Sequence, residues 1–146
     1  MISAEPIDPA GLLDAFTREV AGAGAIASFT GLVRSDDGTV SGLWLDHHPV
    51  LTEQVIGEIA AQAESRVGAL VHITHRVGSV AVGEPIVFVA AAARHRRAAF
   101  DAVDYMMDRL KTDAPLWKRE QRGDTAIWIE AREADHQDRA RWEVKP

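Results

Sequence analysis

Residues 86–119 read IVFVAAAARHRRAAFDAVDYMMDRLKTDAPLWKR, and this stretch decides the fold. Its beginning, Ile86–Ala93, is apolar at every position, which predicts a strand covered on both faces. A basic cluster follows, and then the pattern of a helix over about His95–Thr112. Beyond a proline turn, alternating residues predict a hairpin with strands at Leu116–Gln121 and Thr125–Ala131. The stretch therefore predicts a central strand, a helix and a hairpin in sequence.

Outward from this stretch, the pattern predicts two further helices and several strands. One helix is expected from Pro9 to about Ala21 with Asp8 as its N-cap, and another from about Leu51 to Val67 with Thr52 or a neighbour as its cap. The other expected strands are Ala25–Arg34, Val40–His47 as its hairpin partner, and Val71–Val77. This order predicts an α+β fold: a single domain over residues 1–146, with a mostly antiparallel or mixed sheet flanked by helices.

Composition narrows the class of protein. The chain has 146 residues, of which 47% are hydrophobic and 26% charged, as in ordinary globular proteins. No stretch approaches the ~20 apolar residues of a membrane span, and no signal-peptide pattern opens the sequence, so we expect a cytoplasmic protein without a membrane partner. The chain lacks cysteine, which excludes disulfides, thiolate metal sites and a thiol nucleophile of its own. With net charge −6 and 6% aromatic residues, nucleic-acid binding is not favoured.

Positive charge is concentrated where the chain as a whole is acidic. Arg94–Arg97 join the apolar strand to the helix, whose N-terminus offers free N–H groups to a phosphate or carboxylate. Pairing with the surplus acidic residues is the alternative explanation. The histidines lack the spacing of metal ligands, because His72 and His75 on one strand point to opposite faces. We therefore expect an anion site and neither a metal nor a cofactor.

Helical periodicity places two of the cations near the core. The predicted apolar stripe of the helix consists of Phe100, Val103, Met107 and Leu110. On the helical wheel Lys111 falls about 20° from Phe100, and Arg96 about 40° on its other side. A partly buried Lys111 near other cations would have a lowered pKa and could serve as a base or nucleophile. A lysine that extends from the rim of the core is the alternative, and Lys118 could equally be a solvated strand charge.

The distance between the two ends of this helix suggests how a site could be assembled. Arg96 and Lys111 are separated by about 22 Å along the helix axis. Both cations could contact one small ligand only if a second copy of the chain supplies one of them. We therefore predict a homodimer with a site shared between its subunits.

Seven sequence segments, in order along the chain, form a recognisable set. They are Phe29–Arg34 (FTGLVR), Leu45–Pro49 (LDHHP), His75–Gly78 (HRVG), Gly83–Val89 (GEPIVFV), His95-Arg96 with Ala99-Phe100, Leu110–Glu120 (LKTDAPLWKRE) and Trp128–Arg132 (WIEAR). Together they resemble the family of large, catalytic subunits of molybdopterin synthase, and Leu110–Glu120 is the most specific of them. Asp46 and His48 depart from the family pattern, which often has Glu and an aromatic residue at these two positions.

The resemblance implies a hammerhead-like α/β fold and a sulfur-transfer function. Family members convert cyclic pyranopterin monophosphate (precursor Z) to molybdopterin by inserting two sulfurs. The sulfur arrives as a thiocarboxylate on the C-terminal glycine of a small ubiquitin-like carrier subunit, so the large subunit needs no cysteine and no cofactor. Two large subunits dimerise at the centre of a heterotetramer.

The resemblance also implies roles for individual residues. Lys111 and Lys118 match the catalytic lysines of the family. The matching substrate-binding positions are Arg34, His95, Arg96, Arg132, Phe29 and Met107. A non-catalytic module that binds a phosphate or a nucleotide through the same cations remains the alternative.

Overall fold

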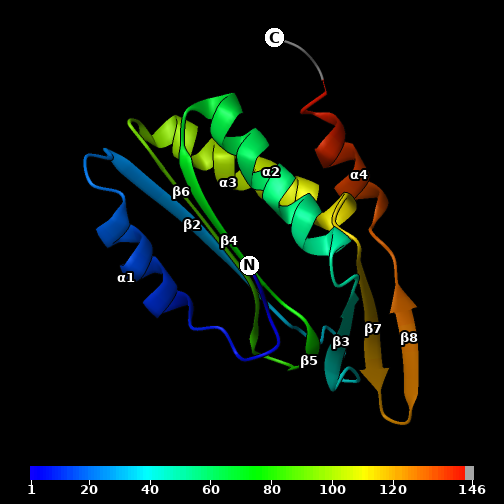
Figure 1. The fold of residues 1–146 in the computed structure, drawn as a ribbon. Coiled ribbons are helices and arrows are strands. Elements are labelled where there is room, and N and C mark those ends of the chain that lie inside the picture. The colour runs from blue at the N-terminus through cyan, green and yellow to red at the C-terminus, as the bar shows by residue number, and fades with distance from the viewer. Residues whose placement is uncertain (144–146) are drawn as a thin grey trace.

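The computed structural model describes residues 1–143 and divides the strands between two sheets (Figure 1). The first sheet has the order β1-β4-β6-β2, formed by Ile2–Ser3, Leu70–Arg76, Pro85–Ala93 and Ala25–Leu32. The second has the order β5-β3-β7-β8, formed by Gly78–Ala81, Gly42–His47, Leu116–Arg122 and Thr125–Ile129. The helices are α1 (Pro9–Glu19), α2 (Leu51–Val67), α3 (Arg96–Thr112) and α4 (Glu133–Ala140). Within the described residues every strand pair is antiparallel except β1 with β4.

The predicted α+β class is confirmed, with the strands forming two sheets. Residues 144–146, which the predicted domain includes, lie outside the described part of the chain. Within residues 1–143 no helix combines the length and the apolar character needed to cross a membrane. β1 and α4 were not predicted from the sequence pattern, and β5 lies between the expected strands Val71–Val77 and Ile86–Ala93.

β6 is the centre of the first sheet, as its apolar sequence predicts. It pairs with β2 on one side and β4 on the other, and every residue after Pro85 is buried. Its side chains alternate between two cores. Val87, Val89, Ala91 and Ala93 belong to the larger core with α2 and α3, whereas Phe88, Ala90 and Ala92 pack with α1. Figure 1 shows this layering, with α1 on one face of the sheet and α2 and α3 on the other.

One predicted strand pairing is wrong. Val40–His47 was expected to form a hairpin with Ala25–Arg34, but β2 pairs with β6 and β3 pairs with β5 and β7. The pairing of β2 shifts register between Gly31 and Leu32, and the chain then leaves the first sheet. The pattern of alternation predicted both strands correctly. It could not predict the partner, because strand pairing is decided by which surfaces fit together in three dimensions.

The buried face of α3 is rotated from the predicted one. Phe100 is 59% exposed, and Val103 and Met107 are only half-buried. The residues that pack inward are Ala99, Ala102, Tyr105, Met106 and Leu110. Small alanines on α3 face the alanine-rich β6, and their size allows the helix to lie close to the sheet. Lys111 and Arg96 are consequently exposed residues, so their predicted positions on or beside the buried stripe are wrong.

The start of α2 is capped by a neighbour of Thr52, which is one of the two alternatives expected from the sequence. Val50 occupies the N-cap position, and the Nδ1 atom of His48 accepts hydrogen bonds from the backbone N–H groups of Val50 and Leu51 at 3.3 and 3.0 Å. Thr52, predicted as a cap, is instead completely buried. Its Oγ1 accepts from the His48 N–H and donates to the Pro115 carbonyl, both at 2.8 Å. This hydroxyl therefore connects α2 to the start of β7.

The other predicted cap is correct in position only. Asp8 is the N-cap residue of α1 and Pro9 stands at its first position, but the Asp8 side chain makes no capping hydrogen bond.

The Thr52 connection gives a testable stability effect. Thr52→Val preserves shape but leaves two part-buried backbone groups, the His48 N–H and the Pro115 carbonyl, without their partner, so we expect a loss of about 1–2 kcal/mol in the free energy of unfolding. Urea denaturation measures it. The matched control is Thr17→Val, because the exposed Thr17 hydroxyl bonds only to Leu13 in its own helix; this change should cost about 0.5 kcal/mol or less. Equal losses in both variants would contradict the bridging role of Thr52.

Candidate active site

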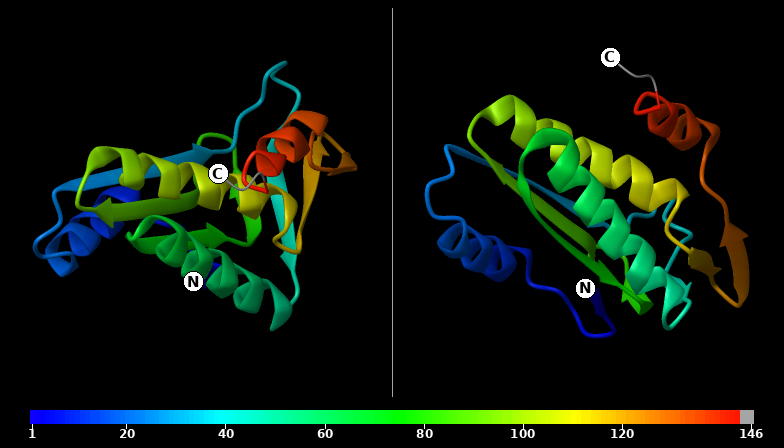
Figure 2. Two further views of the ribbon diagram at one scale, coloured as in Figure 1. Left: turned by 90° about the horizontal axis from the view of Figure 1, so that it is seen from above. Right: turned by 45° about the horizontal axis from the view of Figure 1, so that its top comes forward.

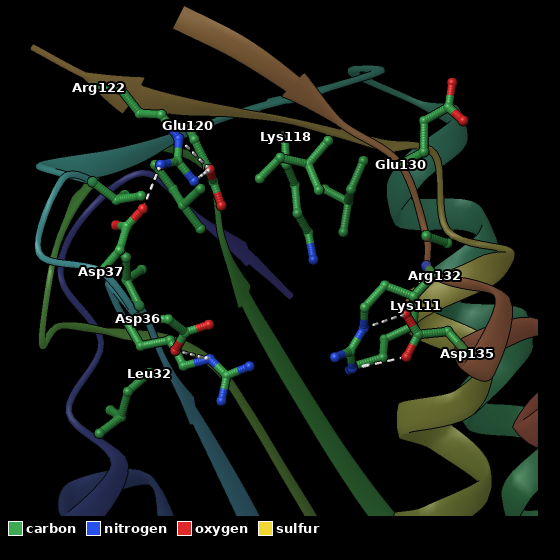
Figure 3. A pocket seen from close by; sticks show the side chains of 17 residues that line it. Leu32, Asp36, Asp37, Lys111, Lys118, Glu120, Arg122, Glu130, Arg132 and Asp135 are labelled. Atoms are coloured by element: carbon green, nitrogen blue, oxygen red, sulfur yellow. Dashed lines mark hydrogen bonds and ion pairs between the residues drawn. The ribbon is translucent and has the colours of Figure 1, made fainter.

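Two adjoining cavities lie between the first sheet, the C-terminal end of α3 and the hairpin β7–β8. Their volumes are about 440 and 410 Å³. Residues that line both are Leu32, Arg34, Leu43, Lys111, Leu116, Lys118 and Arg132. We call the first the polar cavity, because ten of its lining residues are charged. We call the second the apolar cavity, because nine of its sixteen lining residues are hydrophobic, although the four shared cations and His75 also line it. Figure 3 shows the polar cavity, with Lys118 projecting into it between Lys111 and Arg132 on one side and Asp36 and Asp37 on the other.

Four separate segments supply the cations that border both cavities. Arg34 follows β2, Lys111 stands in the last turn of α3, Lys118 lies on β7 and Arg132 is the N-cap of α4. Because strand residues alternate between faces, Lys118 points into the cavities while its neighbours point away. On the outer face of the sheet, Arg119 stacks between the rings of Trp44 and Trp128, at 5.8 and 5.0 Å from the ring centroids.

Lys118 is the more buried of the two lysines. Burial lowers its pKa, and the nearby charge of Lys111 lowers it further, while Asp135 opposes both effects. The Lys111 side chain is 39% exposed, and its Nζ lies 3.2 Å from Asp135 Oδ1. The sequence had suggested a partly buried lysine with a lowered pKa at Lys111 and a possible solvated charge at Lys118. The structure places the lowered pKa on Lys118.

Asp135 is a member of the site that sequence reasoning missed. It is 9% exposed, and its Oδ2 accepts hydrogen bonds from the backbone N–H and the Nε of Arg132 at 2.9 and 3.4 Å. Burial raises its pKa, but hydrogen bonds from Arg132 and Lys111 outweigh this effect and lower it overall. The signal was a capping-box spacing between residues 132 and 135, with Arg in place of the usual Ser or Thr.

The apolar cavity contains the predicted residues Phe29 and Met107 and an unpredicted histidine. Phe29 is 41% exposed and Met107 half-buried. His75 is 5% exposed, and its Nδ1 lies 2.8 Å from the Arg76 carbonyl oxygen, to which it donates. Burial and the charge of Lys118 lower the pKa of His75 to about 4, against the opposing hydrogen bond. His75 is therefore neutral near pH 7.

The chain shares its sequence and its fold with known proteins. The family model of the MoaE protein matches residues 2–113. Over 140 residues the chain is 46% identical to the molybdopterin synthase catalytic subunit of Caulobacter vibrioides, with 95% of this chain and 93% of the relative covered. The chain belongs to the MoaE family of molybdopterin synthase catalytic subunits.

Solved structures of the family have the same fold. The molybdopterin biosynthesis MoaE protein of Burkholderia ambifaria superposes with a TM-score of 0.84 at 38% identity, covering 99% of this chain and 97% of that one. Molybdopterin synthase of Staphylococcus aureus gives a TM-score of 0.78 at 26% identity, covering 88% of this chain and 94% of that one. The resemblance found in the sequence motifs is thus confirmed.

Two residues that the MoaE resemblance assigns to the substrate lie elsewhere. His95 is the N-cap of α3 and Arg96 its first residue; both are exposed, and neither lines the two cavities. The length of α3 separates them from Lys111 by about 22 Å. A single chain therefore joins Lys111 with Lys118, Arg34 and Arg132, but not with His95 and Arg96.

The two departures from the MoaE sequence pattern also lie outside the cavities. Asp46 Oδ1 accepts a hydrogen bond from Trp44 Nε1 at 2.7 Å, and His48 caps α2. Neither residue lines the polar or the apolar cavity. Their effect falls on the hairpin surface and on the helix start.

The buried His75 predicts a pH dependence of stability. Its pKa is about 4 in the folded protein and 6.5 as the reference value, so the unfolded chain binds more protons between these pH values. The free energy of unfolding should therefore rise by about 3 kcal/mol from pH 4 to pH 6.5 through this group. Urea denaturation as a function of pH should show a smaller rise for His75→Gln. His136→Gln, at an exposed position of α4, is the control; equal pH slopes in the two variants would refute the assignment.

Proposed function

We propose that this chain is the catalytic subunit of a molybdopterin synthase. It converts cyclic pyranopterin monophosphate to molybdopterin, with sulfur delivered by a thiocarboxylate on the C-terminal glycine of a small ubiquitin-like carrier. The observation that carries the proposal is the convergence of Arg34, Lys111, Lys118 and Arg132 on two adjoining cavities in a chain of net charge −6. Family membership identifies the chemistry for which this convergence is suited.

The two cavities suit the two anionic reactants. Guanidinium groups bind phosphate oxygens in bidentate geometry, which assigns Arg34 and Arg132 to the cyclic phosphate. The apolar cavity, with Phe29 and Met107 in its wall, suits the flat pterin ring. The carrier's C-terminal tail would enter beside Lys111, the more exposed lysine.

The lysines suit a sulfur transfer that needs no thiol of this chain. The thiocarboxylate sulfur attacks a side-chain carbon of the pterin, where a C–S bond forms as a C–O bond breaks; the oxygen leaves with the opened phosphodiester at one carbon and as water at the other. Water then cleaves each resulting thioester and leaves a carboxylate on the carrier. The Lys111 ammonium would orient the thiocarboxylate and stabilise the negative charge that develops. Lys118, whose pKa is lowered, would exchange a proton as the phosphodiester opens.

The assembly extends beyond one chain. His95 and Arg96 would reach the cavities of a second copy of the chain, which makes the site a property of a homodimer within a heterotetramer. The reaction would take place in the cytoplasm. The alternative, a non-catalytic phosphate- or nucleotide-binding module, uses the same cations but gives no role to the lowered pKa of Lys118.

The first test is substitution of the lysines. With thiocarboxylated carrier and cyclic pyranopterin monophosphate, Lys111→Ala and Lys118→Ala should each lower the rate of molybdopterin formation at least about 100-fold, because a cation is lost where charge develops. Mass spectrometry of the pterin products measures this, and circular dichroism checks folding. Arg18→Ala, on the exposed face of α1, is the control. Full activity of Lys111→Ala would refute its role; a wild-type chain that binds phosphate without forming product would favour the alternative.

The shared site is tested by mixing inactive variants. Arg96→Ala and Lys111→Ala should each be inactive as homodimers. In a randomly mixed population half of the dimers are heterodimers with one intact site, so activity should recover to about a quarter of wild type. Native mass spectrometry verifies the exchange of subunits. Exchange without any recovery would show that each site is built from one chain.

A further inference from the structure

We propose that Asp135 is a positioning residue of the sulfur-transfer site, which holds Lys111 and Arg132 side by side through its one carboxylate. The two oxygens have separate partners: Oδ1 faces Lys111 Nζ at 3.2 Å, and Oδ2 accepts the backbone N–H and Nε of Arg132. Figure 3 shows all three side chains at one wall of the polar cavity. The catalytic part of the inference rests on the function proposed above.

Asp135 is buried enough to act as a fixed point. Its side chain is 11% exposed, against 39% for Lys111 and 65% for Arg132. The two long cationic side chains are thus partly exposed to solvent, whereas the short carboxylate between them is nearly buried. Long side chains lose conformational freedom when they are held, and a fixed partner reduces this cost at the moment when substrate binds.

The position of Asp135 is itself set from α3. Asp108 of α3 accepts hydrogen bonds from Arg141 Nη2 and Trp142 Nε1, each at 2.7 Å. One turn further, Asp113 accepts from Arg139 Nε, also at 2.7 Å. These bonds dock α4 and its C-terminal turn on the helix that carries Lys111. The carboxylate and the ammonium are therefore held relative to one rigid element.

Two further contacts complete this docking. The rings of Tyr105 and Trp142 meet edge to face with centroids 5.4 Å apart. Arg66 of α2 donates from Nη2 to the Trp142 carbonyl oxygen at 2.9 Å. Figure 2 shows α4 lying beside the end of α3. The tertiary contacts thus reach α4 from both α2 and α3.

Asp135 also balances charge around Lys118. Lys111 and Arg132 lower the pKa of Lys118, and Asp135 raises it. The other charged or titratable residues that line the two cavities are Arg34, Asp36, Asp37, His75, Glu120, Arg122 and Glu130. If the Asp135 charge is removed, the titration of Lys118 should move to lower pH. This shift reports the charge of Asp135 near Lys118, and the effect on kcat tests whether Asp135 positions Lys111 and Arg132.

The experiment compares Asp135→Asn with wild type. The chain has lysine only at positions 111, 118 and 145, so ε-¹³C-lysine labelling gives three NMR signals, which Lys→Gln variants assign. We expect Asp135→Asn to lower the pH midpoint of Lys118. With carrier and substrate at saturation, kcat should fall about 10- to 100-fold while KM changes less, because misplaced groups chiefly affect the transition state. Asp135→Glu, which restores the charge, should recover most of the Lys118 midpoint.

Glu133→Gln is the matched control, because it removes one negative charge from an exposed position in the same first turn of α4. It should change neither kcat nor the Lys118 midpoint. Should Asp135→Asn unfold, Asp135→Ser keeps an oxygen acceptor for the Arg132 N–H and gives the same comparison. An unchanged Lys118 midpoint and kcat in the folded variant would overturn the proposal. If wild type forms no molybdopterin, the function fails, and the Lys111 NMR signal still decides whether Asp135 holds that lysine: a signal that does not change in Asp135→Asn would overturn the contact.

Discussion

The burial of β6 on both faces is the constraint on which the rest of the structure depends. A strand with no solvent-facing side needs a layer on each side, and α1 supplies one while α2 and α3 supply the other. The alanines of β6 then determine how closely α3 approaches and which face of α3 turns inward. That rotation leaves Lys111 exposed in the last turn of α3, where it lines the cavities together with β7 and the start of α4.

The site depends on how the repulsion between its cations is compensated by neighbouring carboxylates. Four cations border both cavities, and five carboxylates line the polar one with them: Asp36, Asp37, Glu120, Glu130 and Asp135. Cations this close repel one another unless such anions lie nearby. Within the described residues the anions are unevenly placed. Arg34 pairs with Asp36, Arg132 and Lys111 share Asp135, and Lys118 makes no ion pair. An unpaired, half-buried lysine is costly for stability and useful for proton transfer, which is the compromise expected of a functional site.

Local sequence signals predicted the elements better than their partners. The α2 boundaries, the doubly covered β6 and the β7–β8 hairpin follow from periodicity and turn residues. The pairing of β3 and the inward face of α3 do not, because both are decided by which surfaces fit together in three dimensions. Of the residues that the motifs assigned to one site, Lys111, Lys118, Arg34 and Arg132 line the same cavities, whereas His95 and Arg96 do not. Asp135 and His75 were not predicted as site residues. Asp135 lies on the unpredicted helix α4, and His75 has the sequence pattern of an ordinary strand residue.

The stack of Arg119 between Trp44 and Trp128 has a consequence for β7. One side of the second sheet lines the cavities, and this stack spans β3, β7 and β8 on the other side. The stacked guanidinium and indole groups thus support β7 from its outer side, while its inner side stays open to ligands. Along β7, tolerance to mutation should therefore alternate residue by residue: the even-numbered residues from Leu116 to Arg122 line the cavity, and Arg119, among the odd-numbered ones, supports the strand from the other side. One strand thus provides both the site residue Lys118 and the support that holds it in place.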